Sequence, residues 1–133
     1  MPDAQLGRSR LVAQGLVTRP FARPSGAVAA LGAMQGQDLP GVLASAALRT
    51  ASGDIRDVLE DLDAGALVRG YPMRGTVFLM PAADVIWVTE LCAAPAVRAA
   101  RNRRPQLGLD QTHLDEALVV AAARGDDGLA VER

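Results

Sequence analysis

Apolar residues recur at helical spacing along most of the chain, so the sequence predicts a mainly α-helical protein. In the first amphipathic run, Leu6, Leu11 and Val12 fall on one side of a helix while two arginines fall elsewhere. We expect helices over residues 5–16, 27–35, 39–49, 95–104 and 110–124, with others between Asp54 and Gly65 and starting at Pro81.

Polar residues mark where these helices begin. Ser25 is a candidate N-cap for the second helix and Asp38 for the third, in which Pro40 occupies the tolerant first turn. Ser52 or Asp54 caps the fourth helix. Its apolar face carries Ile55, Val58, Leu59 and Leu62, and its other positions carry Asp54, Asp57, Glu60, Asp61 and Asp63. Because anions would repel that acidic face, we expect it to point away from them or to pack internally.

Two short apolar, β-branched runs interrupt the helical pattern. Residues 66–71 and 76–80 predict two strands, and residues 72–75 predict the turn between them, with Arg74 and Gly75 near its tip. Helix, strand, tight turn and strand in this order is the outline of a winged helix. The expected fold class is therefore mainly α with a small β-hairpin, a winged helix-turn-helix.

Composition fits one compact domain with the start of another. The 133 residues are half apolar, and the formal net charge of −1 gives no overall basic field. All 14 basic residues are arginine and none is lysine. This bias has two compatible readings, a coding preference of a GC-rich genome and bidentate recognition of phosphates by guanidinium groups.

The single cysteine and single histidine exclude several site classes. Because Cys92 is the only cysteine, no internal disulfide can form, and a cytoplasmic location is expected. Cys92 lies in a helical run and is expected to be a buried, inert residue. His113 lies in a different, polar segment and is given no role. No zinc finger, other metal site or cofactor is expected, and neither a membrane span nor a secretory signal is predicted.

Two motifs carry a resemblance to a known family. The segments 31–41, with Gln35-Gly36-Gln37, and 71–76, with Arg74-Gly75-Thr76, resemble the helix-turn-helix 42 family. This family of winged-helix DNA-binding proteins includes the AlkZ/YcaQ-type DNA glycosylases, which excise alkylated purines and unhook interstrand crosslinks. The similarity runs from about residue 8 to residue 124.

The resemblance implies a partner, a reaction and a larger architecture. The partner is double-stranded DNA, with nucleoid association when bound, and the reaction is hydrolysis of an N-glycosidic bond without metal or cofactor. Intact members carry three tandem winged-helix domains and a C-terminal β-barrel. We therefore expect residues 1–104 to form the first winged-helix domain. Residues 105–133 would be a linker and the opening helix of a truncated second domain, and the isolated chain would be inactive.

The expected catalytic residues are Gln35 and Gln37. Spacing alone is equally typical of solvated glutamines at a helix end, and the resemblance is what identifies them as site positions. They share one side only if the segment is extended or a turn, which Gly36 permits. Family glycosylases have an apolar residue at position 36 and commonly a histidine at position 78, where this chain has Phe78. Asp38 is an alternative general base, with N-capping as its structural interpretation.

Expected DNA contacts lie at the turn and at a basic cluster. They are Arg74, Gly75, Thr76, Arg101, Arg103 and Arg104. The alternative for Arg74 is a surface arginine that hydrogen-bonds a carbonyl of the turn, and the alternative for the cluster is a solvated helix end.

Trp87 and Phe78 are expected in the core. A non-catalytic winged-helix regulator and an inactive interaction fragment remain open as rival functions.

Overall fold

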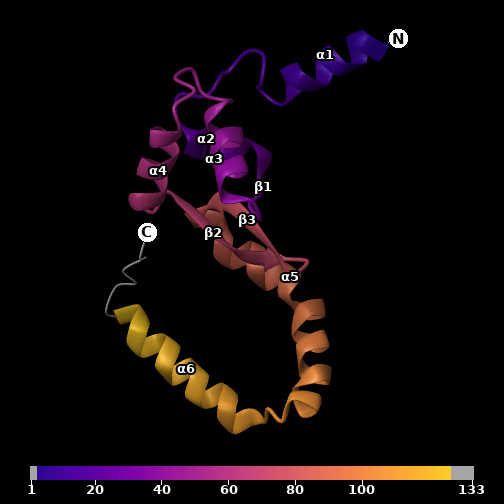
Figure 1. Ribbon diagram of the computed structural model, residues 1–133, viewed down its shortest axis with the longest axis vertical. Coiled ribbons are helices and arrows are strands. Elements are labelled where there is room, and N and C mark those ends of the chain that lie inside the picture. The colour runs from indigo at the N-terminus through magenta and orange to yellow at the C-terminus, as the bar shows by residue number, and fades with distance from the viewer. Residues whose placement is uncertain (1–2, 127–133) are drawn as a thin grey trace. The chain divides into compact units, whose positions relative to one another are not determined.

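The computed structural model describes residues 3–126, which divide into two units. The first unit extends to Ala96 and the second begins at Val97, so the division lies inside a helix. Figure 1 shows the order of the elements along the chain. The predicted boundary between residues 104 and 105 stays a prediction.

Four helices open the first unit. They are α1 (Asp3–Ala13), α2 (Pro24–Leu31), α3 (Leu39–Ala47) and α4 (Ile55–Asp63). The range predicted for the second helix was wrong, because the helix starts at Pro24 and ends before Gly32, whose φ of 76° is left-handed. Ser25 is therefore inside the helix, and its N–H donates to the carboxylate of Asp61 in α4. Asp54 caps α4 as predicted and accepts from the N–H of Arg56.

The core of the first unit lies where α2, α3 and α4 meet the sheet. Its buried residues include Val28, Val42, Leu43, Ala46, Val58, Leu67 and Leu79. Val58 is fully buried, whereas Ile55 and Leu59 on the same predicted apolar face are each 42% exposed. Only part of the apolar face of α4 is therefore buried in this core.

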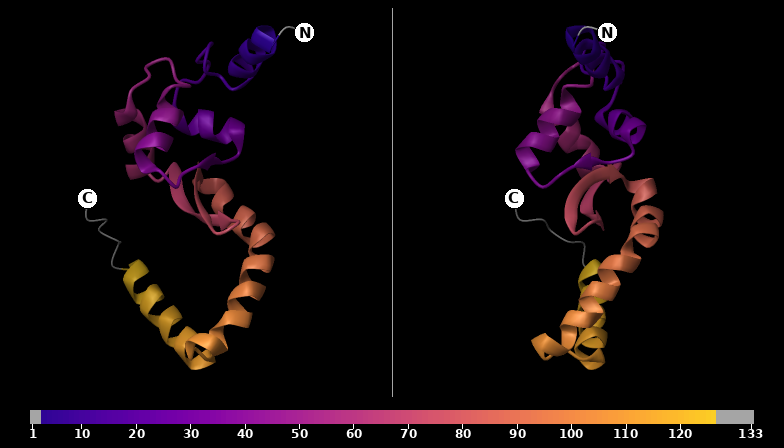
Figure 2. Two further views of the ribbon diagram at one scale, coloured as in Figure 1. Left: turned by 45° about the vertical axis from the view of Figure 1, so that its right-hand side comes forward. Right: turned by 90° about the vertical axis from the view of Figure 1, so that its right-hand side faces the viewer.

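The sheet has three antiparallel strands, one more than predicted. They are β1 (Met34–Gln35), β2 (Leu67–Met73) and β3 (Thr76–Pro81), in the order β1-β3-β2. Arg74 and Gly75 form the two-residue turn with φ values of 54° and 69°, which is the left-handed geometry of tight hairpin turns. Figures 1 and 2 show β2 and β3 as a twisted hairpin beside the first turns of the next helix. The predicted mainly α, winged-helix class is confirmed.

Helix α5 (Ala82–Arg103) is continuous where a break was predicted. Pro95 lies inside it and does not end it, so the two expected helices are one. In the second unit, the 3₁₀ helix η1 (Arg104–Leu107) occupies most of the predicted linker, and α6 (Gln111–Asp126) follows. No helix among the described residues is both long and apolar enough to cross a bilayer.

The burial of four singled-out residues differs. Phe78 is a core residue as predicted, only 6% exposed. Trp87 was predicted in the core and is 54% exposed, because it lines an open groove beside the sheet rather than a closed core. Cys92 is half-buried rather than buried. His113 is exposed, and its backbone N–H donates to the carboxylate of Asp110 just before α6.

Candidate functional site

Gln35 lies at the edge of the sheet and faces solvent. It belongs to β1, where it is paired with Phe78 of β3, so the segment is extended rather than a helix end. The Gln35 side chain makes no hydrogen bond to any described residue and is exposed. Its amide is therefore free to act on an external group.

Gln37, by contrast, is tied to the neighbouring strand. Its Oε1 accepts a hydrogen bond of 3.3 Å from the N–H of Val77. The intervening Gly36 donates its own N–H to the carbonyl of Val77 at 2.8 Å. Together these two bonds continue the β1–β3 pairing past the end of β1. In the first of them, the side-chain oxygen of Gln37 takes the place of a backbone carbonyl.

Gly36 lies close against β3. A Cβ added there would stand 3.0 Å from the backbone N of Leu79 and 3.1 Å from the carbonyl carbon of Phe78. The φ of Gly36 is not in the left-handed region, unlike that of six other glycines. The expected reason for glycine, freedom to turn, was therefore wrong, since close approach of two backbones is what requires it.

Arg69 completes this arrangement, although it was not among the predicted site residues. From β2, its Nε donates to the carbonyl of Gly36 at 2.9 Å and its Nη2 donates to the carbonyl of Gln37 at 3.3 Å. A lone arginine inside the apolar run of a predicted strand was the available signal. Its partners, more than 30 residues away, could not be read from that signal.

Asp38 follows the glutamines at the N-cap position of α3. Its backbone has the extended geometry of an N-cap, and its carbonyl accepts from Val42 N–H at 3.0 Å, but its side chain makes no capping hydrogen bond. The carboxylate instead lies against Gly41 and leaves no room there for a Cβ. The predicted side-chain cap is therefore absent, and general-base chemistry at Asp38 stays a hypothesis.

The predicted DNA-contacting residues divide between the two units. Arg74 is exposed at the hairpin turn, with its guanidinium carbon 5.7 Å from the centre of the Phe78 ring, a cation–π distance. The hydroxyl of Thr76 is buried and has no hydrogen-bond partner among the described residues. Arg101 and Arg103 are exposed in the last turn of α5, and Arg104 is half-buried.

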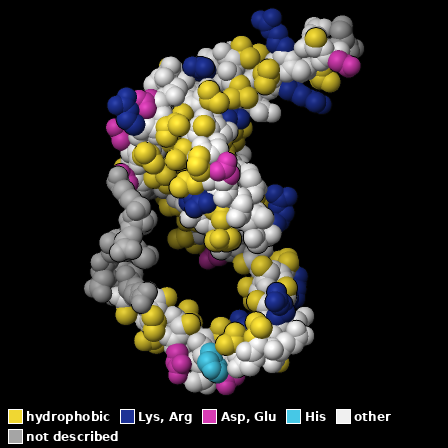
Figure 3. All heavy atoms as spheres, viewed as in Figure 1, with side chains coloured by type: hydrophobic (Ala, Val, Ile, Leu, Met, Phe, Trp, Pro, Cys, Tyr) yellow, Lys and Arg dark blue, Asp and Glu magenta, His cyan; other side chains and the backbone are white. Residues whose placement is uncertain are grey.

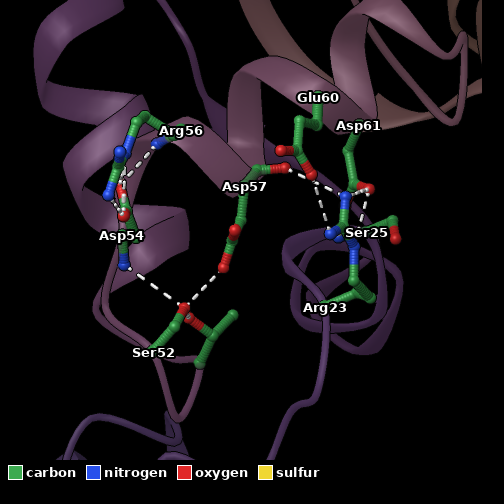
Figure 4. A network of polar contacts seen from close by, with 9 residues as sticks. Arg23, Ser25, Ser52, Asp54, Arg56, Asp57, Glu60 and Asp61 are labelled. Carbon is green, nitrogen blue, oxygen red and sulfur yellow. Dashed lines mark hydrogen bonds and ion pairs between the residues drawn. The ribbon is translucent and has the colours of Figure 1, made fainter.

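The acidic side chains of α4 are largely paired within the first unit. Arg23 binds Asp61 at 2.5 Å and Glu60 at 3.1 Å, while Asp54 binds Arg56 at 2.6 Å (Figure 4). Asp61 is 5% exposed, so at this position the acidic face packs internally, which was one of the two expectations. Burial pushes the pKa of Asp61 up, but the hydrogen bonds from Arg23 and Ser25 outweigh it and hold that pKa below its usual value.

Neither a basic patch nor a metal cluster marks the surface in view. On the face shown in Figure 3, the arginine side chains are scattered rather than gathered. Among residues 3–126, no group of three or more His, Cys, Asp or Glu side chains is placed to hold a metal ion.

An open apolar groove of about 420 Å³ lies between the sheet and α5, lined by residues that include Leu31, Met73, Phe78, Met80, Trp87 and Leu91.

Comparison with known proteins identifies the family. A family model described as DNA glycosylase AlkZ-like matches residues 28–132. No curated protein and no solved structure matches the chain. Because the family match covers most of its length, the chain belongs to the AlkZ-like DNA glycosylase family. The resemblance in the sequence is thereby confirmed, and membership indicates a DNA glycosylase-related function.

Proposed function

We propose that this chain carries the reactive glutamine motif of a DNA glycosylase that hydrolyses the N-glycosidic bond of an alkylated purine, or a crosslinked one, in duplex DNA. Family membership supports the reaction class. The observation that carries the proposal is the contrast within the motif. Gln35 presents a free, exposed amide, while Gly36 and Gln37 on its C-terminal side are hydrogen-bonded to β2 and β3.

A neutral amide suffices for this substrate class. A purine alkylated at N7 is cationic, so its bond to the sugar is already weakened and needs no acid. Water adds its oxygen to C1′ as the C1′–N9 bond breaks, the bonding electron pair neutralises the base, and the proton goes to solvent. The enzyme must hold that water and stabilise the positive charge on the sugar.

The exposed, unbonded amide of Gln35 supports assigning this task to Gln35. Its Oε1 presents the negative end of an amide dipole to water and to the oxocarbenium-like sugar. The Oε1 of Gln37 already accepts the Val77 N–H, so its free hydrogens are the groups it offers outward. We therefore assign water and sugar stabilisation to Gln35, and to Gln37 the support of the strand edge with a secondary contact to DNA.

The hairpin and the basic end of α5 supply the proposed duplex contacts. Arg74 is exposed at a turn, where wings commonly meet the DNA backbone. Gly75 allows close approach of that turn, and at Thr76 the buried hydroxyl leaves the backbone as the contacting part. The arginines Arg101, Arg103 and Arg104 would meet phosphates elsewhere. Further winged-helix domains of the same protein are proposed to complete the grip on the duplex.

The test is release of free base from a duplex that contains N7-methylguanine. The chain alone and the chain joined to further winged-helix domains of the family are each incubated with this duplex. Release by the joined form, and its loss in Gln35→Ala, is the expected result. Absence of release from both forms, with both glutamines intact, would reject the glycosylase function.

A non-catalytic DNA-binding module is the second candidate. Phe78 favours it, because this buried ring occupies the position where family glycosylases commonly carry a histidine. This alternative predicts duplex binding with a steep salt dependence but no base release, and Gln35→Ala would leave affinity unchanged. Binding titrations at several salt concentrations, run beside the release assay, separate the two functions.

A further inference from the structure

The glutamine motif is hydrogen-bonded by a side chain from β2, the strand at the opposite edge of the sheet. In the strand order β1-β3-β2, Arg69 of β2 lies two strands away from the motif, a separation of about 10 Å. Its register partner is Leu79 of β3, which pairs in turn with Met34 of β1. The side chain of Arg69 therefore spans β3 to reach the segment that follows β1.

The two hydrogen bonds of Arg69 end on consecutive peptide carbonyls of the motif. Nε reaches the Gly36 carbonyl at 2.9 Å, and Nη2 reaches the Gln37 carbonyl at 3.3 Å. Hydrogen bonds from a charged donor are stronger than neutral ones, and the planar guanidinium fixes both carbonyls in one orientation. The N–H of Gly36 is held at the same time by the Val77 carbonyl at 2.8 Å.

We infer that Arg69 is a positioning residue, whose guanidinium fixes the peptides of Gly36 and Gln37 and thereby sets the place of the Gln35 amide. This inference rests on the proposed function. Gln35 has no side-chain hydrogen bond of its own to hold it, so its backbone and that of the next residues set its position. A displacement of about 1 Å at a reacting group is enough to lower a rate about 100-fold.

Amide hydrogen exchange tests the positioning without any need for activity. In Arg69→Met and Arg69→Lys, exchange of the Gly36 N–H is expected to be about tenfold faster than in the unaltered chain. The Val58 N–H in the core is expected to be unchanged. Arg98→Met is the matched control, since Arg98 is exposed and makes no hydrogen bond or ion pair with described residues. Unchanged exchange at Gly36, or equal acceleration at Gly36 and Val58, would overturn the inference.

Base-release kinetics supply the second readout. They are measured on whichever form releases base, the chain alone or the chain joined to further winged-helix domains. Arg69→Met and Arg69→Lys should lower kcat at least tenfold, with KM for the duplex and the salt dependence of binding within twofold of the unaltered protein. A weaker affinity with a shallower salt slope and unchanged kcat would make Arg69 a phosphate contact and overturn the inference. If no form releases base, the proposed function fails, and hydrogen exchange alone decides the role of Arg69.

Discussion

The side-chain Oε1 of Gln37 accepts a hydrogen bond of 3.3 Å from the backbone N–H of Val77. Val77 is 4% exposed, so this N–H has little access to water when its partner is removed. Gln35, two residues earlier, makes no comparable bond. The two glutamines of one motif therefore have different relationships to the fold, and stability measurements can separate them.

We predict that Gln37→Met destabilises the protein by about 1–2 kcal/mol, because it leaves the Val77 N–H unpaired. Gln37→Glu keeps an acceptor at the same position and should cost less. Gln35→Met should change the free energy of unfolding by no more than about 0.5 kcal/mol, as is usual for an exposed side chain without partners. Urea denaturation followed by circular dichroism measures all three. Equal losses for Gln35→Met and Gln37→Met would contradict the division of roles.

Gly36→Ala is expected to cost about 1–3 kcal/mol. The added methyl would stand 3.0 Å from the Leu79 backbone, so β1 and β3 would have to move apart. Gly70→Ala is the control, because Gly70 pairs with Phe78 from the other side and a Cβ there meets no atom within 4 Å. Denaturation midpoints check the pair, and a neutral Gly36→Ala would show that the strands are not packed as described.

Asp61→Asn should destabilise the protein by about 1–3 kcal/mol at neutral pH, because Arg23 and the Ser25 N–H lose a buried carboxylate. The folded-state pKa of Asp61 is lowered, so its contribution is present above the unfolded-state pKa. That contribution is lost as the pH falls through the lower folded-state pKa.

The measurement for Asp61 is the free energy of unfolding from pH 7 to pH 2. The difference in free energy of unfolding between the unaltered chain and Asp61→Asn should be constant above about pH 5 and should shrink at lower pH. Asp38→Asn is the control: the Asp38 side chain makes no capping bond, so this change should cost no more than about 0.5 kcal/mol. A gap that widens on acidification would refute the stated role of the Arg23–Asp61 pair.

Arg74→Asn is expected to weaken duplex binding and to reduce the slope of log K against log salt by about 0.9, the loss of one phosphate contact. Asparagine tolerates the left-handed backbone at this turn, so the hairpin is retained. Arg56→Gln is the control, because Arg56 is paired with Asp54 and is not among the proposed duplex contacts. Fluorescence anisotropy at several salt concentrations gives the slopes, and equal slopes for Arg74→Asn and the unaltered chain would remove Arg74 from the interface.

Local signals in the sequence predicted most of the helices and the hairpin. Asp54 capped α4 and Gly65 followed its end as expected, since such signals act within a few residues. The helix break predicted at Pro95 was wrong, because helix α5 continues through that residue. Strand β1 is only two residues long and exists through pairing with β3, more than 40 residues away, so no local pattern marks it.

The choice of Gln35 and Gln37 as site residues comes from the family resemblance and stays a prediction, because spacing alone did not distinguish them from solvated residues. The contacts that hold their backbone could not be predicted from the sequence. The contacts of Arg69 and the burial of Asp61 depend on partners from distant elements. The prediction for Trp87 was wrong because its apolar run lines an open groove beside the sheet rather than a closed core. Tertiary partners of this kind leave no periodicity in the sequence.

The central claim is that Gln35 acts directly on the sugar and the water. Single-turnover release of N7-methylguanine from a duplex, in the form of the protein that carries out the reaction, tests it most directly. We predict that Gln35→Ala slows release about 100-fold at unchanged duplex affinity, and that Gln37→Ala slows it less. Release by Gln35→Ala at the rate of the unaltered protein would contradict the account.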